Sequence, residues 1–246
     1  MDYRWHCDEL ASEGERFVDV ARRSGDVVVP SCPEWRVGDL LAHVGFVHRW
    51  AEYLVRHRAP TRLSARDMGL SRGPVDADWI AEGLSALLAT LRASDPDDEM
   101  WAWGADQHVR FWARRQLHET LVHRIDLEGA SGEASEVDPV VAADAIDEFL
   151  VNLASAGAFS PGVKNLVGSG ETLTFRSDEG RSWNVVLTPE GFELVDTRDS
   201  SHATLSAPAS ELLLVLYRRR SLEDSSSVLE GDADIVTHWL AHSALL

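Results

Sequence analysis

The residues best suited to chemistry lie in one stretch, Arg110 to Asp126, which reads RFWARRQLHETLVHRID. Read as a helix at about 100° per residue that includes the preceding His108, it has one strip roughly 60° wide that carries His108, Trp112, Glu119, His123 and Asp126. A helix that only packs against a core would fill such a strip with apolar side chains. A carboxylate and an imidazole one turn apart can point at a common atom, which makes a metal site worth testing. A surface ion pair between Glu119 and His123 is the commoner use of this spacing.

A third ligand from another segment would favour the metal site. The stretch Val37–His57, VGDLLAHVGFVHRWAEYLVRH, has apolar residues at helical spacing and is predicted to form a helix. His43 lies at the border of its apolar stripe. A single histidine there is usually a hydrogen-bonded core residue, whereas His48 and His57, farther along, are predicted to be solvated.

Facing helices of a bundle often build metal centres from their side chains. If His43 lies near Glu119 and His123, the three form a His₂Glu set. Three protein ligands with an open fourth position are typical of catalytic zinc. Asp126 has two roles open to it, to orient His123 or to bind the metal itself. An ion pair between Asp126 and a nearby arginine explains it equally well, the candidates being Arg114, Arg115 and Arg124.

Composition limits the classes of function. The chain has 246 residues, 44% of them hydrophobic, and carries a net charge of −18. This charge argues against nucleic acid as a partner, because phosphate binding needs a basic face. The absence of a long apolar run argues against a membrane span, and the N-terminus shows no signal-peptide pattern. The two cysteines, Cys7 and Cys32, form no disulfide framework and no zinc signature, so a reducing cytoplasm is the expected compartment.

Helical periodicity dominates the first part of the chain. The expected helices span residues 3–24, 37–57, 76–94 and 110–126, and a fifth begins at Pro139 behind the cap Asp138. Two loops, residues 58–74 and the Trp101–Trp103 segment, are candidates for lining a site. These elements predict an antiparallel helical bundle in residues 1–157.

The pattern changes after Gly157. Alternating apolar residues predict short strands at 171–176, 183–187, 192–195, 203–206 and 227–230. Helices are expected near 209–219 and from about Asp232. Residues 158–246 are therefore predicted to form a small α+β domain, and the fold class is a helical bundle followed by an α+β domain.

Two stretches together carry a resemblance to a known family. VPSCPEWRVGDLLAHVG and FWARRQLHETLVHRIDLE are similar to segments of the mycothiol-dependent maleylpyruvate isomerase family, which belongs to the DinB-like superfamily. The similarity covers nearly the whole chain, including DPVVAADAIDEFL and ELLLVLYRRRSLEDSSSVLEGDADIVTHWL. It implies a DinB-like four-helix metal-binding bundle joined to a C-terminal domain related to sterol carrier proteins. It also implies that His43, Glu119 and His123 bind zinc or another divalent metal.

The resemblance further implies mycothiol, a cytosolic thiol, as cofactor. The metal would hold the mycothiol sulfur as thiolate, the reactive form. In the isomerase this thiolate would add to the double bond of maleylpyruvate, and rotation followed by elimination would give fumarylpyruvate. Other members are expected to be S-transferases that attach mycothiol to a small electrophile. The partners are thus a small thiol and a small electrophile, and the oligomeric state, a monomer included, stays open.

An arginine of the C-terminal domain is implied to bind the substrate carboxylates. The nearest match is the stretch YRRRS, in which Arg219 aligns best with the LWGR-like pattern of the family. Arg218 stands where that pattern has glycine, so Arg218 and Arg220 remain alternatives. A structural explanation of these arginines is that their positive charge is favourable at the C-terminus of a helix.

Two other classes of function remain. A non-catalytic sensor or carrier would keep the metal or a small molecule without turnover. Metal-dependent hydrolysis through a zinc-bound water is weaker, because Glu119, as a ligand, would not be available as the base. No nucleophile elbow, phosphate loop or nucleotide fingerprint supports other enzyme classes.

Overall fold

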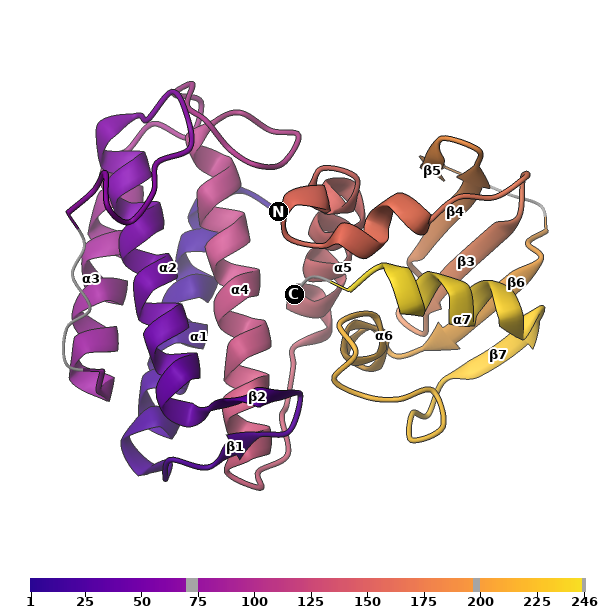
Figure 1. Ribbon diagram of the computed structural model, residues 1–246, viewed down its shortest axis with the longest axis horizontal. Coiled ribbons are helices and arrows are strands. Elements are labelled where there is room, and N and C mark those ends of the chain that lie inside the picture. The colour runs from indigo at the N-terminus through magenta and orange to yellow at the C-terminus, as the bar shows by residue number, and fades with distance from the viewer. Residues whose placement is uncertain (70–74, 197–199, 245–246) are drawn as a thin grey trace. The chain divides into compact units, whose positions relative to one another are not determined.

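The computed structural model describes residues 1–69, 75–196 and 200–244, and the chain forms two compact units, Met1–Ser135 and Glu136–Leu246 (Figure 1). Residues 70–74, the end of the loop expected at 58–74, lie outside the described residues.

The first unit is a bundle of four long helices. These are α1 (Tyr3–Arg23), α2 (Val37–His57), α3 (Ala77–Ala93) and α4 (Val109–Ala130). Local signals explain where they begin, since the carboxylates of Asp2 and Asp76 accept hydrogen bonds from the first turns of α1 and α3. Helices α1 and α2 each pack against both α3 and α4, and Figure 1 shows the four side by side. The contact of α2 with α4 is the one that matters for the site.

A two-stranded hairpin joins α1 to α2 and packs on α4. Strand β1 (Val28–Val29) pairs antiparallel with β2 (Cys32–Arg36). Pro30 and Pro33 cannot continue a helix, which explains the break between α1 and α2, whereas the sequence pattern does not predict the hairpin. Its base is held by the ion pair of Arg36 with Asp26. Val29 is fully buried, so the hairpin is part of the core of this unit.

The second unit is an α+β domain with a mixed sheet. Helix α5 (Pro139–Leu153) and two short 3-10 helices, η1 (Ala156–Ala158) and η2 (Pro161–Asn165), precede the sheet. The strands are β3 (Thr172–Ser177), β4 (Ser182–Thr188), β5 (Gly191–Val195), β6 (Ala203–Ala207) and β7 (Val228–Gly231), in the order β5-β4-β3-β6-β7. All neighbours are antiparallel except β3 and β6. Helices α6 (Ala209–Leu216) and α7 (Ala233–His242) complete the unit.

Helix α5 belongs to this second unit. Its Asp147 accepts hydrogen bonds from Arg181 and from the indole of Trp183, at 2.5 and 2.6 Å, and Phe149 packs on Tyr217. The compact units therefore divide after Ser135, whereas the expected boundary lay after residue 157. The difference has a physical origin: periodicity shows that α5 buries a face but not against which partner.

The predicted fold class is confirmed, with a helical N-terminal region followed by an α+β domain. Among the described residues, no helix combines the length and apolar character needed to cross a membrane.

Candidate metal centre

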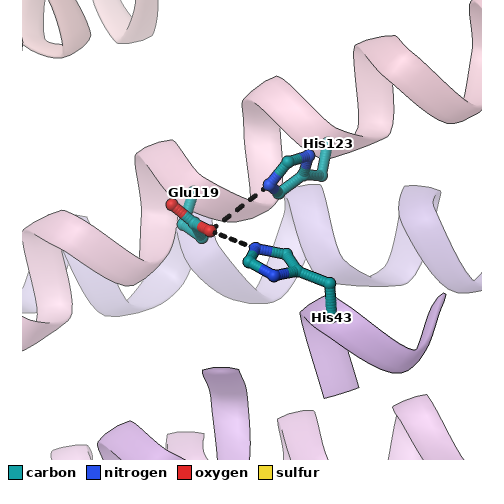
Figure 2. A group of neighbouring side chains, drawn as sticks. All are labelled: His43, Glu119 and His123. Carbon is teal, nitrogen blue, oxygen red and sulfur yellow. Dashed lines mark hydrogen bonds and ion pairs between the residues drawn. The ribbon is translucent and has the colours of Figure 1, made fainter. Parts of the chain in front are cut away.

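His43 of α2 and the pair Glu119 and His123 of α4 come together, as Figure 2 shows. One carboxylate oxygen, Glu119 Oε1, lies 2.9 Å from His43 Nε2 and 3.3 Å from His123 Nε2. The two imidazole rings meet edge to face with their centroids 4.8 Å apart. Both Nε2 atoms therefore point at the same small region, which no pairing along one helix would produce.

The donor set fits a divalent cation. One ligand atom from each residue lies within 4.8 Å of the others. A tetrahedral zinc with bonds of about 2.0–2.1 Å separates neighbouring donors by about 3.3 Å, so small side-chain movements suffice. The side chains of His43, Glu119 and His123 are 33%, 21% and 12% exposed, so the group is sheltered but open to a small molecule. Two imidazoles and one carboxylate match the donors of catalytic zinc sites.

Arg115 holds the second oxygen of Glu119. It lies one turn before Glu119 on α4, is almost fully buried, and donates to Glu119 Oε2 at 3.1 Å. Burial would raise the pKa of Glu119, but hydrogen bonds from His123 and His43 and the charge of Arg115 bring it well below its usual value. Glu119 is therefore ionised and ready to act as a ligand.

Asp126 orients His123, the first of the two roles considered for it. Its Oδ2 lies 2.9 Å from His123 Nδ1, and its Oδ1 accepts a hydrogen bond of 2.5 Å from the Ser31 hydroxyl in the hairpin turn. Burial would lower the pKa of His123, but the hydrogen bonds and charges of Asp126 and Glu119 outweigh it and raise the pKa to about 9. A carboxylate behind a ligating histidine is the usual partner that fixes the ring.

The hairpin also places one aromatic side chain, that of Trp35, beside the candidate ligands. The ring of Trp35 in β2 lies 5.0 Å from that of His43 and 6.2 Å from that of His123, measured between centroids. Trp35 is partly exposed. One indole therefore packs on both imidazoles and restricts their orientation.

His48 was predicted to be solvated, and that prediction is wrong. Its side chain is fully buried, and its Nε2 lies 2.9 Å from the hydroxyl of Thr120. Thr120 is the residue after Glu119 in sequence. Burial lowers the pKa of His48 to about 4, so the ring is neutral at pH 7. His57, treated together with it, is exposed as predicted.

Two residues of the predicted strip do not join the group. His108 is the N-cap of α4 and interacts with Asp106 and Arg110. Trp112 is fully buried and packs edge to face on Trp50, while Trp101 and Trp103 of the aromatic segment are partly exposed. Helical spacing predicts the direction in which a side chain points but not how deeply it is buried, so the strip included both His108 and Trp112.

The candidate substrate arginine lies in the second unit, just after α6. Arg219 is partly exposed and donates from its guanidinium to the carbonyl of Tyr217 at 2.8 Å. Arg218 adopts a left-handed backbone conformation with φ of 60° and is exposed. Arg220 pairs with Glu211 at 3.5 Å. The role of Arg219 stays a prediction.

Sequence reasoning missed the roles of Ser31, Trp35 and Arg115. Arg115 had a signal, since it lies four residues before Glu119, the spacing of a helical ion pair. Ser31 and Trp35 lie in a short segment whose docking depends on tertiary packing. Nothing in their local pattern indicates a neighbour on α4.

Residues 7–128 match the family model described as mycothiol maleylpyruvate isomerase N-terminal domain, and residues 140–238 match that of the C-terminal domain of the same family. A search of curated proteins finds no match.

Two similar crystal structures are those of the mycothiol-dependent maleylpyruvate isomerase and of a point mutant of it. Each is 12% identical, with a TM-score of 0.61 over 92% of this chain and 93% of the other. At that identity the structures support the fold, while the two family models span nearly the whole sequence. The chain belongs to the mycothiol-dependent maleylpyruvate isomerase family of enzymes.

Proposed function

We propose that this protein is a metal- and mycothiol-dependent enzyme acting on a small electrophile, as an isomerase of the maleylpyruvate type or as an S-transferase. One observation carries the proposal: His43, Glu119 and His123 converge from two helices on one sheltered point. A divalent ion, zinc by its donor preferences, is the group that such a set suits.

The chain's own residues have distinct tasks in this proposal. His43, Glu119 and His123 hold the ion. Asp126 keeps the Nδ1 of His123 protonated, so that its Nε2 is the ligand atom. The bound ion would supply a positive centre that keeps the cofactor thiol ionised at neutral pH. The thiol belongs to the cofactor, so neither Cys7 nor Cys32 is required as a nucleophile.

Arg219 is proposed to bind a carboxylate of the substrate. Support comes from the backbone at Arg218, because a left-handed residue after a helix is the position where glycine is normally found. The family pattern expected in YRRRS has glycine there, followed by arginine. This agreement favours Arg219 over Arg218 and Arg220 as the functional residue.

A cytoplasmic location follows as part of the proposal, since the cofactor is a cytosolic thiol. The net charge of −18 fits small-molecule partners and not nucleic acid.

Metal content of the purified protein is the first test. Wild type is expected to hold about one divalent ion per chain, and Glu119→Ala and His123→Ala to lose it, because a site of three ligands cannot spare one. His57→Ala, which removes an exposed histidine of α2, is the matched control and should keep the metal. Wild type that neither contains nor takes up zinc would refute the metal centre.

Turnover then separates the two reactions. The metal-loaded protein would be mixed with mycothiol and either maleylpyruvate or a halogenated electrophile. Fumarylpyruvate formed with mycothiol unconsumed identifies the isomerase. A mycothiol adduct with halide release identifies the transferase. Binding of mycothiol without turnover of any electrophile would instead favour a sensor or carrier.

Replacing Arg219 tests the carboxylate role. Arg219→Ala is expected to lower kcat/KM by about 10–100-fold, the usual size of a lost charge-assisted hydrogen bond. Metal content should not change. Arg220→Ala is the control, because its guanidinium pairs with Glu211. Loss of activity in Arg220→Ala but not in Arg219→Ala would contradict the assignment.

A further inference from the structure

The turn of the hairpin reaches the metal centre through one hydroxyl. Ser31 lies between β1 and β2 and donates to Asp126 Oδ1, while Asp126 Oδ2 faces His123 Nδ1. The side chain of Asp126 is fully buried. Ser31 lies 95 residues before Asp126 in sequence, so a chain of two hydrogen bonds runs from a distant turn through Asp126 to the candidate ligand His123.

The direction of these hydrogen bonds fixes which ring nitrogen of His123 keeps a proton. A carboxylate only accepts, so the Ser31 hydroxyl and the His123 Nδ1–H must both donate to Asp126. With the proton held on Nδ1, the lone pair of a neutral ring lies on Nε2, the atom that faces Glu119. The hydroxyl also limits rotation of the carboxylate, because each oxygen then has its own donor.

The position of Ser31 is set by the fold and not by the site. Its neighbour Val29 is fully buried and pairs with Cys32 across the turn, and Pro30 fixes the backbone between them. Trp35, four residues on, packs on the imidazoles of His43 and His123. The hairpin is thus anchored in the core and touches the centre at two places.

We propose that Ser31 is a positioning residue, which sets the orientation of Asp126 and through it the tautomer and ring angle of His123. This inference rests on the proposed metal centre and extends it to a residue outside the ligand set. Hydrogen-bond partners of ligating histidines typically change metal affinity by about 10–100-fold when they are removed. Ser31 acts one bond farther out, so the lower end of that range is expected.

The test is a double-mutant cycle read by zinc affinity. Zinc dissociation constants would be measured by competition with a chromophoric chelator for Ser31→Ala, Asp126→Asn and the double variant. Ser31→Ala should weaken zinc binding by about tenfold. In the Asp126→Asn background the same change should have no further effect, because the route through the carboxylate is already broken.

Two further variants separate positioning from general stability. Ser31→Thr keeps the hydroxyl and should restore affinity to that of wild type. Ser24→Ala removes another hydroxyl of the same unit, one that bonds the Val20 carbonyl, and should leave affinity unchanged. Equal affinity of Ser31→Ala and wild type would overturn the proposal, as would additive effects in the cycle.

A second readout works on metal-free protein. The Nδ1 proton of His123 should give a protected downfield NMR signal in wild type, which is lost or broadened in Ser31→Ala. An unchanged signal in Ser31→Ala would refute the positioning role. If wild type binds no zinc, the proposed function fails by that result, while this signal still decides the role of Ser31.

Discussion

Each of the three candidate ligands has a partner of different chemistry. A guanidinium holds Glu119, a carboxylate holds His123, and an indole packs on His43. These contacts restrict the side chains before any ligand arrives. Preorganisation of this kind lowers the cost of binding, because less side-chain freedom is lost on complex formation.

The state of His123 predicts how metal uptake depends on pH. Its pKa of about 9 means that the ring is protonated at pH 7, so an incoming ion must displace a proton. Apparent zinc affinity should rise about tenfold per pH unit from pH 7 to 9 and then level off. Zinc competition titrations at several pH values measure this slope.

His123 gives the stability of the metal-free fold the opposite pH dependence, because its contribution to stability falls as the pH rises. A pKa raised from 6.5 stabilises the folded state fully below pH 6.5, and this contribution is lost as the pH rises toward 9. Chemical denaturation of metal-free protein should therefore show a smaller contribution of His123 to stability at pH 9 than at pH 6.

Zinc affinity that does not change between pH 7 and 9 would contradict the raised pKa of His123.

At this scale residue type and spacing predict only part of the site. Glu119 and His123 share a helix, so their spacing fixes their relative direction. His43 completes the ligand set only if it lies near Glu119 and His123, and the structure shows that it does. Ser31 lies in another segment, and the register between segments depends on packing that no local pattern records.

Among the elements, the helices were the most predictable. The expected span of α2 agrees with the structure, and α3 and α5 begin behind the carboxylates of Asp76 and Asp138. Caps and periodicity act over a few residues, so they can be read locally. The hairpin was missed because its first strand, Val28–Val29, is too short to show alternation.

Gly45 allows α2 to approach α3. A Cβ atom added there would lie 2.0 Å from the ring of Trp79 and 2.7 Å from Ile80. Arg49 stacks on the same indole at 3.9 Å, which restricts its escape. Gly45→Ala is therefore expected to destabilise the protein by about 1–3 kcal/mol in chemical denaturation, even though alanine favours a helix.

Gly38→Ala on the same helix is the matched control. A Cβ atom there would meet only a carboxylate oxygen of Asp26, at 3.5 Å, an ordinary contact. It should be neutral or stabilise by up to about 1 kcal/mol. Equal stabilities of the two variants would show that the contact between α2 and α3 is not tight at Gly45.

The whole molecule consists of two units, each with its own core. In the first, buried residues of α1, α2, α3, α4 and the hairpin form one cluster. In the second, α5, α6 and α7 accompany the sheet. All three candidate metal ligands, with Ser31 and Asp126, belong to the first unit. The metal-binding function should therefore be separable from the rest.

Truncation tests this separation. Residues 1–135 expressed alone should be helical, unfold cooperatively and bind zinc with the affinity of the full chain, measured by circular dichroism and chelator competition. Residues 136–246 should fold, whereas residues 158–246 should not, because they lack α5, whose Phe149 packs on Tyr217. Folding of residues 158–246 as stable as that of 136–246 would favour the boundary at 157.

At this scale the spacing of apolar residues indicates the order of the parts, helical first and α+β second, which is confirmed. The boundary differed because α5 has the same apolar periodicity as the bundle helices. A buried face requires a partner, and the identity of that partner is a long-range property. The hydrogen bonds of Asp147 to Arg181 and Trp183, together with the packing of Phe149 on Tyr217, show where α5 belongs.

The parallel pairing of β3 with β6 has a consequence for the order of folding. Strands β3, β4 and β5 form a continuous meander that short loops can close quickly. The centre of the sheet, by contrast, requires Leu173 to meet Ala203 across the whole meander. Closing such long loops slows folding. In refolding experiments the second unit should have a slow final phase, in which β6 and β7 join a meander that has already formed.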